Sequence, residues 1–144
     1  MLTSANSSYV FIHRARLVRM LALMFGGLTP LVCQAPPRHV MLFILECPGG
    51  DCPLLKGVPQ TAGMRSGFVR LKPGESVGWH STAQNEESLI ILRGTGDALI
   101  EGQAKHAFSA VQSLYMPPAT RHNVENTGRE VLEYIYVVAP ASGK

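Results

Sequence analysis

The sequence predicts an all-β fold, either an antiparallel sandwich or a small barrel. Gly occurs 14 times and Pro 10 times in 144 residues, which is too many for a helical bundle. Short apolar or alternating segments follow one another at close intervals and end at turn signals such as Pro73-Gly74. Hydrophobic residues make up 46% of the chain and charged residues 16%, so one domain of this length can bury a core without a metal or disulfide.

The expected strands follow in order along the chain. The first is an apolar run that ends at Cys47-Pro48, and the Gly- and Pro-rich residues 47–63 after it are expected to be a loop. Residues 88–93 form an apolar run that predicts a strand buried on both faces. The last strand is long, rich in Val, Ile and Tyr, and ends at Pro140. The predicted strands are residues 39–46, 64–72, 76–81, 88–93, 97–101, 105–108, 113–116, 121–125 and 131–139.

The charge distribution argues against a nucleic-acid partner. The formal net charge is +3, but residues 1–40 carry four Arg and no acidic residue. From residue 41 onward nine Lys and Arg face ten Asp and Glu, a balance of 9 − 10 = −1. This part of the chain has no basic stripe and few aromatic residues for base stacking, so no nucleic acid is expected to bind.

Residues 1–38 are predicted to be an extension outside the fold. The apolar run 20–32 follows a basic stretch, as in a secretory signal, but it is shorter than the ~20 residues that span a bilayer. The residues before Cys33 make a poor cleavage site. The segment is therefore an export signal, a disordered extension, or the product of a start codon placed upstream of Met20 or Met41, and we favour the last two. A cytoplasmic location is expected, or export if residues 1–35 are a true signal peptide.

Two of the three cysteines bracket a turn. Cys47 and Cys52 flank Pro-Gly-Gly-Asp and could close a small disulfide in an exported protein. A metal site would need more ligands than these two thiols, and the nearest candidate is His39. The preferred interpretation is two unpaired thiols in a loop.

Two later segments carry candidate metal ligands. In the first, His80 and Thr82 stand two residues apart on a short predicted strand, so they share one face. In the second, His122 lies on a strand that follows a turn. Imidazole and carboxylate groups inside a small barrel need partners, because burying them alone is costly. A divalent transition metal is a partner that accepts two imidazoles and one carboxylate.

Both segments resemble the signature motifs of the cupin superfamily. The first motif, G-x5-H-x-H-x(3,4)-E-x6-G, is matched from Gly74 to Gly94 at every fixed position except the second His, where Thr82 stands. The second motif, G-x5-P-x-G-x2-H-x3-N, is matched at its Pro, His and Asn. Val111 and Ala119 replace its two glycines. The resemblance covers about residues 60–140 and implies a single cupin double-stranded β-helix, or jelly-roll barrel, with a strand and loop at 39–57 leading into a barrel at 58–140.

The resemblance also implies a site. It assigns His80, Glu87 and His122 as ligands of a divalent transition metal (Fe, Mn, Ni, Zn or Cu, which the sequence does not distinguish). Thr82 is expected to hold a water or to act as a weak ligand. Glu86 is the rival carboxylate, and Glu87 is preferred because its spacing to the motif's final Gly fits. No catalytic acid or base is assigned.

The expected function is binding of a small polar organic molecule at the open metal site, with oxygenase- or isomerase-type chemistry. The alternative is a non-catalytic barrel that binds a sugar-like molecule without a functional metal, and a third possibility is a purely structural barrel that serves assembly. A homodimer is expected, because residues 39–46 are more apolar than a lone edge strand should be.

Overall fold

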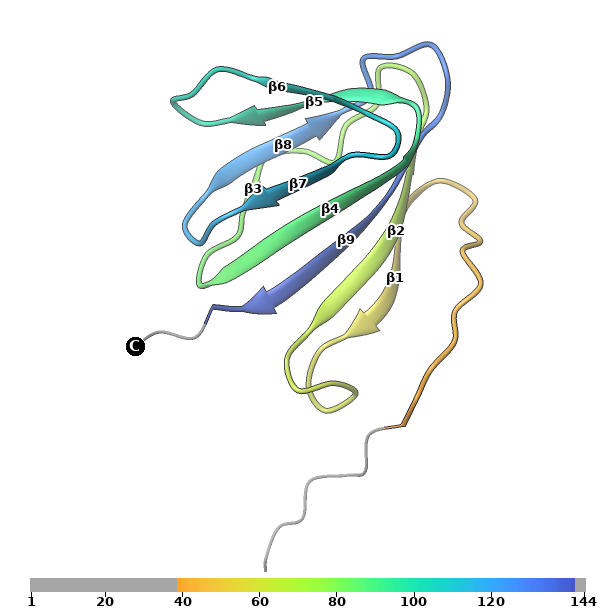
Figure 1. Cartoon of the computed structure of the whole chain (residues 1–144), viewed down its shortest axis with the longest axis vertical. Coiled ribbons are helices and arrows are strands. Elements are labelled where there is room, and N and C mark those ends of the chain that lie inside the picture. Colours follow the sequence, from red (N-terminus) through yellow and green to blue (C-terminus); the bar gives the residue numbers. More distant parts are fainter. Residues whose placement is uncertain (1–38, 142–144) are drawn as a thin grey trace, which may run out of the picture. The chain divides into compact units, whose positions relative to one another are not determined.

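The computed structural model describes residues 39–141, so the predictions for residues 1–38 lie outside it. The described residues form nine strands and no helix, as the predicted all-β class requires (Figure 1). They therefore contain no helix that could cross a membrane. The strands are β1 (Gly50–Lys56), β2 (Arg65–Leu71), β3 (His80–Ser81), β4 (Asn85–Arg93), β5 (Thr95–Ile100), β6 (His106–Ser109), β7 (Ser113–Met116), β8 (Arg121–Glu125) and β9 (Leu132–Pro140).

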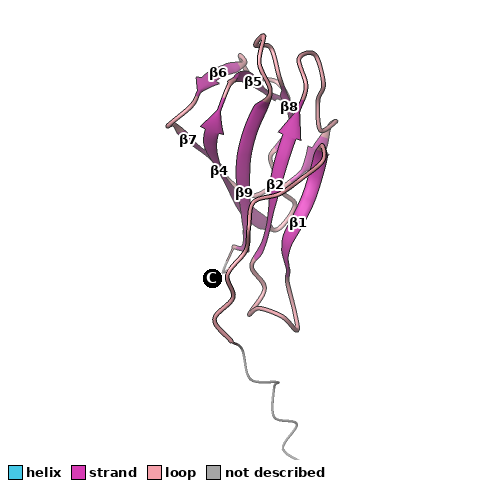
Figure 2. Ribbon diagram, turned by 90° about the vertical axis from the view of Figure 1, so that its right-hand side faces the viewer, coloured by secondary structure: helices cyan, strands magenta, loops and turns pink. Residues whose placement is uncertain are grey.

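The strands form two antiparallel sheets. A five-stranded sheet has the order β1-β2-β9-β4-β7, and a four-stranded sheet has the order β3-β8-β5-β6. The chain crosses repeatedly from one sheet to the other, so strands distant in sequence become neighbours. Figures 1 and 2 show the long strands of the larger sheet side by side. This is the jelly-roll arrangement that the sequence predicts.

The hydrophobic core lies between the two sheets. Leu89 and Ile91 of β4 are each 1% exposed and belong to one buried cluster with Ala98 of β5 and Val124 of β8. Burial of each large aliphatic side chain stabilises the fold by roughly 1.5–3 kcal/mol. The core residues alternate along their strands with residues of the opposite face, so one face of each sheet is turned inward.

The prediction that residues 88–93 are buried on both faces is wrong. Leu89 and Ile91 point into the core, but Ile90 and Leu92 are 43% and 42% exposed. The reason is that no described residue covers the outer face of the five-stranded sheet at β4. An unbroken apolar run does not distinguish a doubly buried strand from one whose outer apolar face is open.

The predicted first strand is also wrong. Residues 39–46 form no strand, and β1 instead lies at Gly50–Lys56, inside the predicted loop. β1 is an edge strand that pairs only with β2, and its register shifts between Pro53 and Leu55. An edge strand with a bulge tolerates Pro. The Pro content of this segment therefore does not exclude a strand, although it predicted a loop. Residues 76–81 form a shorter strand than expected, with only His80–Ser81 in β3 and one isolated bridge at Ser76.

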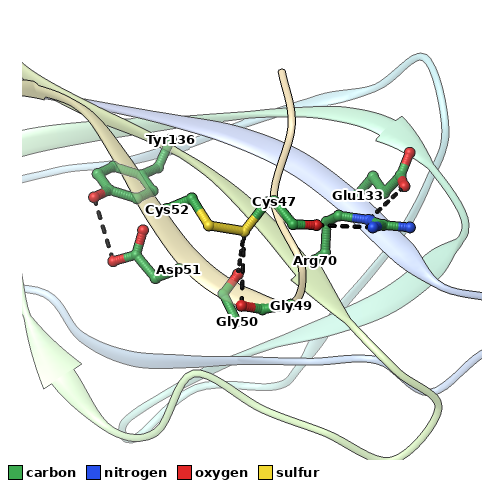
Figure 3. Close-up of a disulfide and its surroundings, with 8 residues drawn as sticks. All are labelled: Cys47, Gly49, Gly50, Asp51, Cys52, Arg70, Glu133 and Tyr136. Carbon is green, nitrogen blue, oxygen red and sulfur yellow. Dashed lines mark hydrogen bonds and ion pairs between the residues drawn. A yellow bond between two sulfur atoms is a disulfide. The ribbon is translucent and has the colours of Figure 1, made fainter. Parts of the chain in front are cut away.

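Cys47 and Cys52 form a disulfide, so the preferred interpretation as unpaired thiols is wrong (Figure 3). Their Cα atoms lie 5.9 Å apart, within the range that a disulfide bridges. The formation of β1 explains the error. Pairing with β2 places Cys52 opposite Phe68, and Arg70 of β2 holds the Cys47 backbone against the same strand. Arg70 donates a 2.8 Å hydrogen bond to the carbonyl oxygen of Cys47 and pairs with Glu133 at 2.9 Å.

Three motif positions of the sequence serve the fold. Val111 and Ala119, which replace the motif glycines, adopt φ values of 65° and 59°. This left-handed conformation favours glycine, so the backbone of the motif is retained without its usual residue. The buried Asn126 amide donates 2.8 Å hydrogen bonds to the carbonyl oxygens of Leu71 and Glu130. The motif Asn therefore ties the end of β2 to the loop before β9.

Candidate metal centre

The two sheets bring three predicted ligands together. His80 of β3 and His122 of β8 are direct register partners, and their ring centroids lie 4.1 Å apart. Glu87 of β4 approaches from the opposite sheet, with its Oε2 atom 3.5 Å from Nε2 of His122. One ligand atom from each of the three residues lies within 4.8 Å of the others. This separation suits donors that converge on one ion.

The backbone fixes the orientation of both imidazoles. The Nδ1 atom of His80 lies 2.9 Å from the carbonyl oxygen of Gly78, and Nδ1 of His122 lies 3.3 Å from that of Thr120. A carbonyl can only accept, so each Nδ1 carries a proton, and in a neutral ring Nε2 is then the nitrogen with the free lone pair. Hydrogen bonds of this kind, from the ring nitrogen that does not face the metal, orient metal-binding histidines. Nε2 of His122 is fully buried and has no hydrogen-bond partner among the described residues.

Burial shifts the charges of the cluster toward neutrality. The pKa of Glu87 is raised mainly by desolvation, which outweighs the stabilising influence of His80 and Arg65 on the carboxylate. The pKa of His122 is lowered, first by burial and then by the neighbouring His80. A neutral imidazole is the form that binds a metal, and a divalent cation would hold Glu87 ionised. The buried Nε2 without a partner and the buried carboxylate are thus a donor set that suits a divalent metal.

The structure separates the two rival carboxylates. Glu87 is 7% exposed and points toward the histidines. Glu86 lies on the opposite face of β4, where its carboxylate accepts a 3.1 Å hydrogen bond from the Tyr115 hydroxyl. The alternation of side chains along a strand accounts for this difference. Glu87 is therefore the carboxylate that the geometry offers to an ion.

Thr82 has a structural role that the sequence did not reveal. It is 4% exposed, and its hydroxyl donates a 2.9 Å hydrogen bond to the carbonyl oxygen of Pro117. The Thr82 hydroxyl oxygen also accepts a 2.9 Å hydrogen bond from the backbone N–H of Thr120. These bonds use the hydroxyl proton and one lone pair. Thr82 thereby braces the turn that leads into β8 and His122.

A cavity of about 670 Å³ extends from the candidate ligands across the inner face of the five-stranded sheet. Its size is within the usual range of small-molecule sites. Tyr134 and Tyr136 line it, although in sequence they look like ordinary sheet residues. Their alternation in β9, in register with Ile91 and Leu89 of β4, is the signal that places them inside.

Other residues of this cavity were missed by the sequence analysis. Asp51 of β1 and Arg65 of β2 line its wall. Neither belongs to a motif, and Asp51 lies in a segment whose composition predicts a loop. Trp79, the chain neighbour of His80, does not line this cavity. It is 46% exposed and has the Arg121 guanidinium 5.3 Å from its ring centroid.

Comparison with known proteins identifies a family and several relatives of this chain. The family model described as "Cupin domain" matches residues 67–138, which contain all three candidate ligands. Two curated proteins named mannose-1-phosphate guanylyltransferase match part of the chain. The one from Salmonella montevideo is 33% identical over 69 residues, which are 48% of this chain and 14% of that protein. The one from Klebsiella pneumoniae is 29% identical over 90 residues, or 62% and 18%. The chain thus spans less than a fifth of these relatives.

Solved structures share the fold at low sequence identity. A Bacillus halodurans protein, BH2720, superposes with a TM-score of 0.62 at 19% identity, covering 76% of this chain and 86% of that one. A Klebsiella pneumoniae protein described as having a double-stranded β-helix domain gives 0.59 at 17% identity, covering 74% and 95%. The Cnp3 cupin domain of Schizosaccharomyces pombe gives 0.57 at 18% identity and 64% coverage of each chain.

Proposed function

Since the chain belongs to the cupin family, we propose that His80, Glu87 and His122 bind one divalent transition metal and present it to a small polar organic molecule. One observation carries the proposal. Nε2 of His122 is fully buried without a hydrogen-bond partner among the described residues, 3.5 Å from the buried carboxylate of Glu87. An unsatisfied buried donor or acceptor normally costs ~1–3 kcal/mol, and a bound cation would remove that cost.

The ligand set leaves room for a substrate. Three protein donors leave positions open on a transition metal, and the cavity beside them can hold a small molecule. When bound, the metal would supply Lewis acidity or a binding position for O₂. The chain itself fixes both imidazoles through Gly78 and Thr120, and it leaves Glu87 only 7% exposed at the cavity. Oxygenase- or isomerase-type reactions remain our proposal for the chemistry.

The metal identity follows from an experiment and not from the donor set. Fe, Mn, Ni, Zn and Cu all accept two imidazoles and a carboxylate. Protein purified without chelators should contain about one equivalent of a transition metal by mass spectrometry, and the metal-free protein should bind Zn²⁺ or Mn²⁺ in a calorimetric titration with the same stoichiometry. Metal content near zero combined with no measurable binding of any of the five ions would refute the proposal.

A sugar-like ligand is the second candidate. The curated relatives are named for an activity on mannose 1-phosphate, and the cavity wall offers hydroxyl and carboxylate groups that bind sugar hydroxyls. We propose this as the role of the barrel if the metal site is not functional. Mannose and mannose 1-phosphate should then raise the melting temperature of the metal-free protein. No shift at millimolar concentration would exclude this candidate.

A further inference from the structure

Asp51 and Tyr136 form a polar pair on the cavity wall and are not among the candidate metal ligands. The Tyr136 hydroxyl lies 3.4 Å from Oδ2 of Asp51 (Figure 3). The pair joins β9 to β1, although β2 runs between these strands. The contact is longer than the ~2.7–2.8 Å typical of O–H···O bonds. Asp51 makes no other side-chain hydrogen bond or ion pair with a described residue, so its carboxylate keeps acceptor capacity.

A glycine makes this pair possible. Gly67 of β2 is the register partner of Tyr136, and a Cβ atom at Gly67 would lie 2.5 Å from Cε1 of the tyrosine ring. The ring therefore lies across the bare backbone of β2 and reaches β1. Any other residue at position 67 would push the ring away from Asp51. The pair is thus built by three adjacent strands.

The disulfide fixes the other half of the pair. Cys52 follows Asp51 directly and points to the opposite face of β1, where it bonds Cys47 (Figure 3). The hydrogen bond from Arg70 to the carbonyl oxygen of Cys47 anchors this loop to the sheet. The backbone at Asp51 is therefore held from the outside while its side chain lies at the cavity.

A positive group lies at the other end of the cavity. Arg65 lines the cavity and makes no ion pair with a described residue. It shares a row of the sheet with Glu87, because both are register partners of Val138. Arg65 stands four residues before Val69, the register partner of Asp51, which is ~13 Å along the strand. The cavity therefore has a cationic end beside the candidate metal ligands and an anionic end at Asp51.

We propose that Asp51 and Tyr136 form a recognition subsite for a hydroxyl or ammonium group of a small molecule whose other end is an anionic oxygen group near Arg65 and the metal. A carboxylate accepts hydrogen bonds and attracts cations, so this end of the cavity selects a donor group. Burial and the neighbouring Asp51 raise the pKa of Tyr136 to about 12, which keeps its hydroxyl protonated at neutral pH. The subsite rests on the proposed function, because the metal supplies part of the anionic-end binding.

A homologous probe series tests this subsite. Unbranched ω-amino acids and ω-hydroxy acids of increasing length are titrated into Zn²⁺-loaded protein, each beside the alkanoate of equal length, which lacks the terminal donor. The best-fitting amino or hydroxy acid should bind about tenfold more tightly than its matched alkanoate. Asp51→Asn and Tyr136→Phe should each reduce this preference, with the larger loss for Asp51→Asn. Glu130→Gln changes an exposed carboxylate outside the cavity and is the matched control. This variant should keep the preference for the donor-bearing acid.

The outcomes separate this inference from the proposed function. Zn²⁺ affinity of Asp51→Asn should stay within about threefold of wild type, since Asp51 is no candidate ligand. The series is repeated on metal-free protein, where weaker binding with the same preference is expected because Arg65 still receives the carboxylate. Loss of Zn²⁺ binding in wild type would refute the metal site alone. Equal binding of donors and alkanoates at every length, or a preference that survives Asp51→Asn, overturns the subsite.

Discussion

Nε2 of His122 and Oε2 of Glu87 lie 3.5 Å apart between the two sheets, and no hydrogen bond joins them. His122 belongs to the four-stranded sheet and Glu87 to the five-stranded sheet, so the pair links the two halves of the barrel. Both groups are almost inaccessible to solvent. His122 and Glu87 would hold the proposed metal from both sheets, and metal binding to the folded chain should therefore raise the melting temperature.

Glu87→Gln should weaken Zn²⁺ or Mn²⁺ binding by about a hundredfold or more. The reason is that loss of a group that only hydrogen-bonds a metal ligand already lowers metal affinity by about 10–100-fold. His122→Asn and His80→Asn should do the same. Glu86→Gln is the matched control, since Glu86 contacts Tyr115 on the other face of β4. Calorimetric titration measures all four variants. A similar loss in Glu86→Gln and Glu87→Gln would contradict the assignment of the carboxylate.

The stability of the metal-free protein should fall as the pH drops below about 6.5. Burial lowers the pKa of His122 from its ordinary value of 6.5, so the unfolded chain binds a proton more readily than the folded one. Stability is then complete above that value and is lost as the pH falls through the folded-state pKa. The raised pKa of Glu87 opposes this at lower pH, because the folded state takes up that proton first.

Urea unfolding of the metal-free protein between about pH 5 and about pH 8 measures this dependence. His122→Asn cannot take up a proton at this position, so its stability should decline less over the same range. An equal decline in wild type and His122→Asn would show that other groups control the acid sensitivity.

Thr82→Val should destabilise the fold by about 1–3 kcal/mol, because it leaves the carbonyl of Pro117 and the N–H of Thr120 without their partner. Thr82→Ser keeps the hydroxyl and is the matched control. Thr82→His, which restores the usual cupin histidine, should tighten metal binding by about tenfold and lose the same two hydrogen bonds. Urea unfolding measures the loss of stability, and metal titration measures the change in metal affinity. Wild-type stability of Thr82→Val would show that the Thr82 hydroxyl does not brace the turn.

The candidate ligands were predictable because motif spacing and strand alternation are local properties. Spacing distinguishes Glu87 from Glu86, and eight of the nine strands lie close to their predicted places. The remaining features depend on pairing between distant segments. β1 forms only because β2 offers its edge, and with β1 come the disulfide and the position of Asp51 in the cavity. The bracing role of Thr82 could not be predicted for the same reason, because its hydrogen-bond partners lie 35 and 38 residues away in the sequence.

Removal of the disulfide in a Cys47→Ser/Cys52→Ser double variant should cost about 2 kcal/mol of stability, the entropy expected for closing so short a loop. Intact-mass measurement with and without reductant should show a difference of two hydrogen atoms for wild type and none for the double variant. A wild type that reacts fully with thiol reagents before reduction would show that the bond is absent in solution.

The chain should form a homodimer through residues 39–46, the segment before β1. Val40, Leu42 and Ile44 have exposed fractions of 103%, 95% and 78%, and no described part of the chain covers them. Consecutive apolar residues left in water favour association, and a second copy of the chain can supply the missing surface. Light scattering at micromolar concentration should give twice the chain mass. Leu42→Lys/Ile44→Lys should give a monomer, because two charges in an apolar interface are costly. Val58→Lys, at another exposed apolar residue, is the control and should remain dimeric. A monomer mass for wild type would refute the prediction.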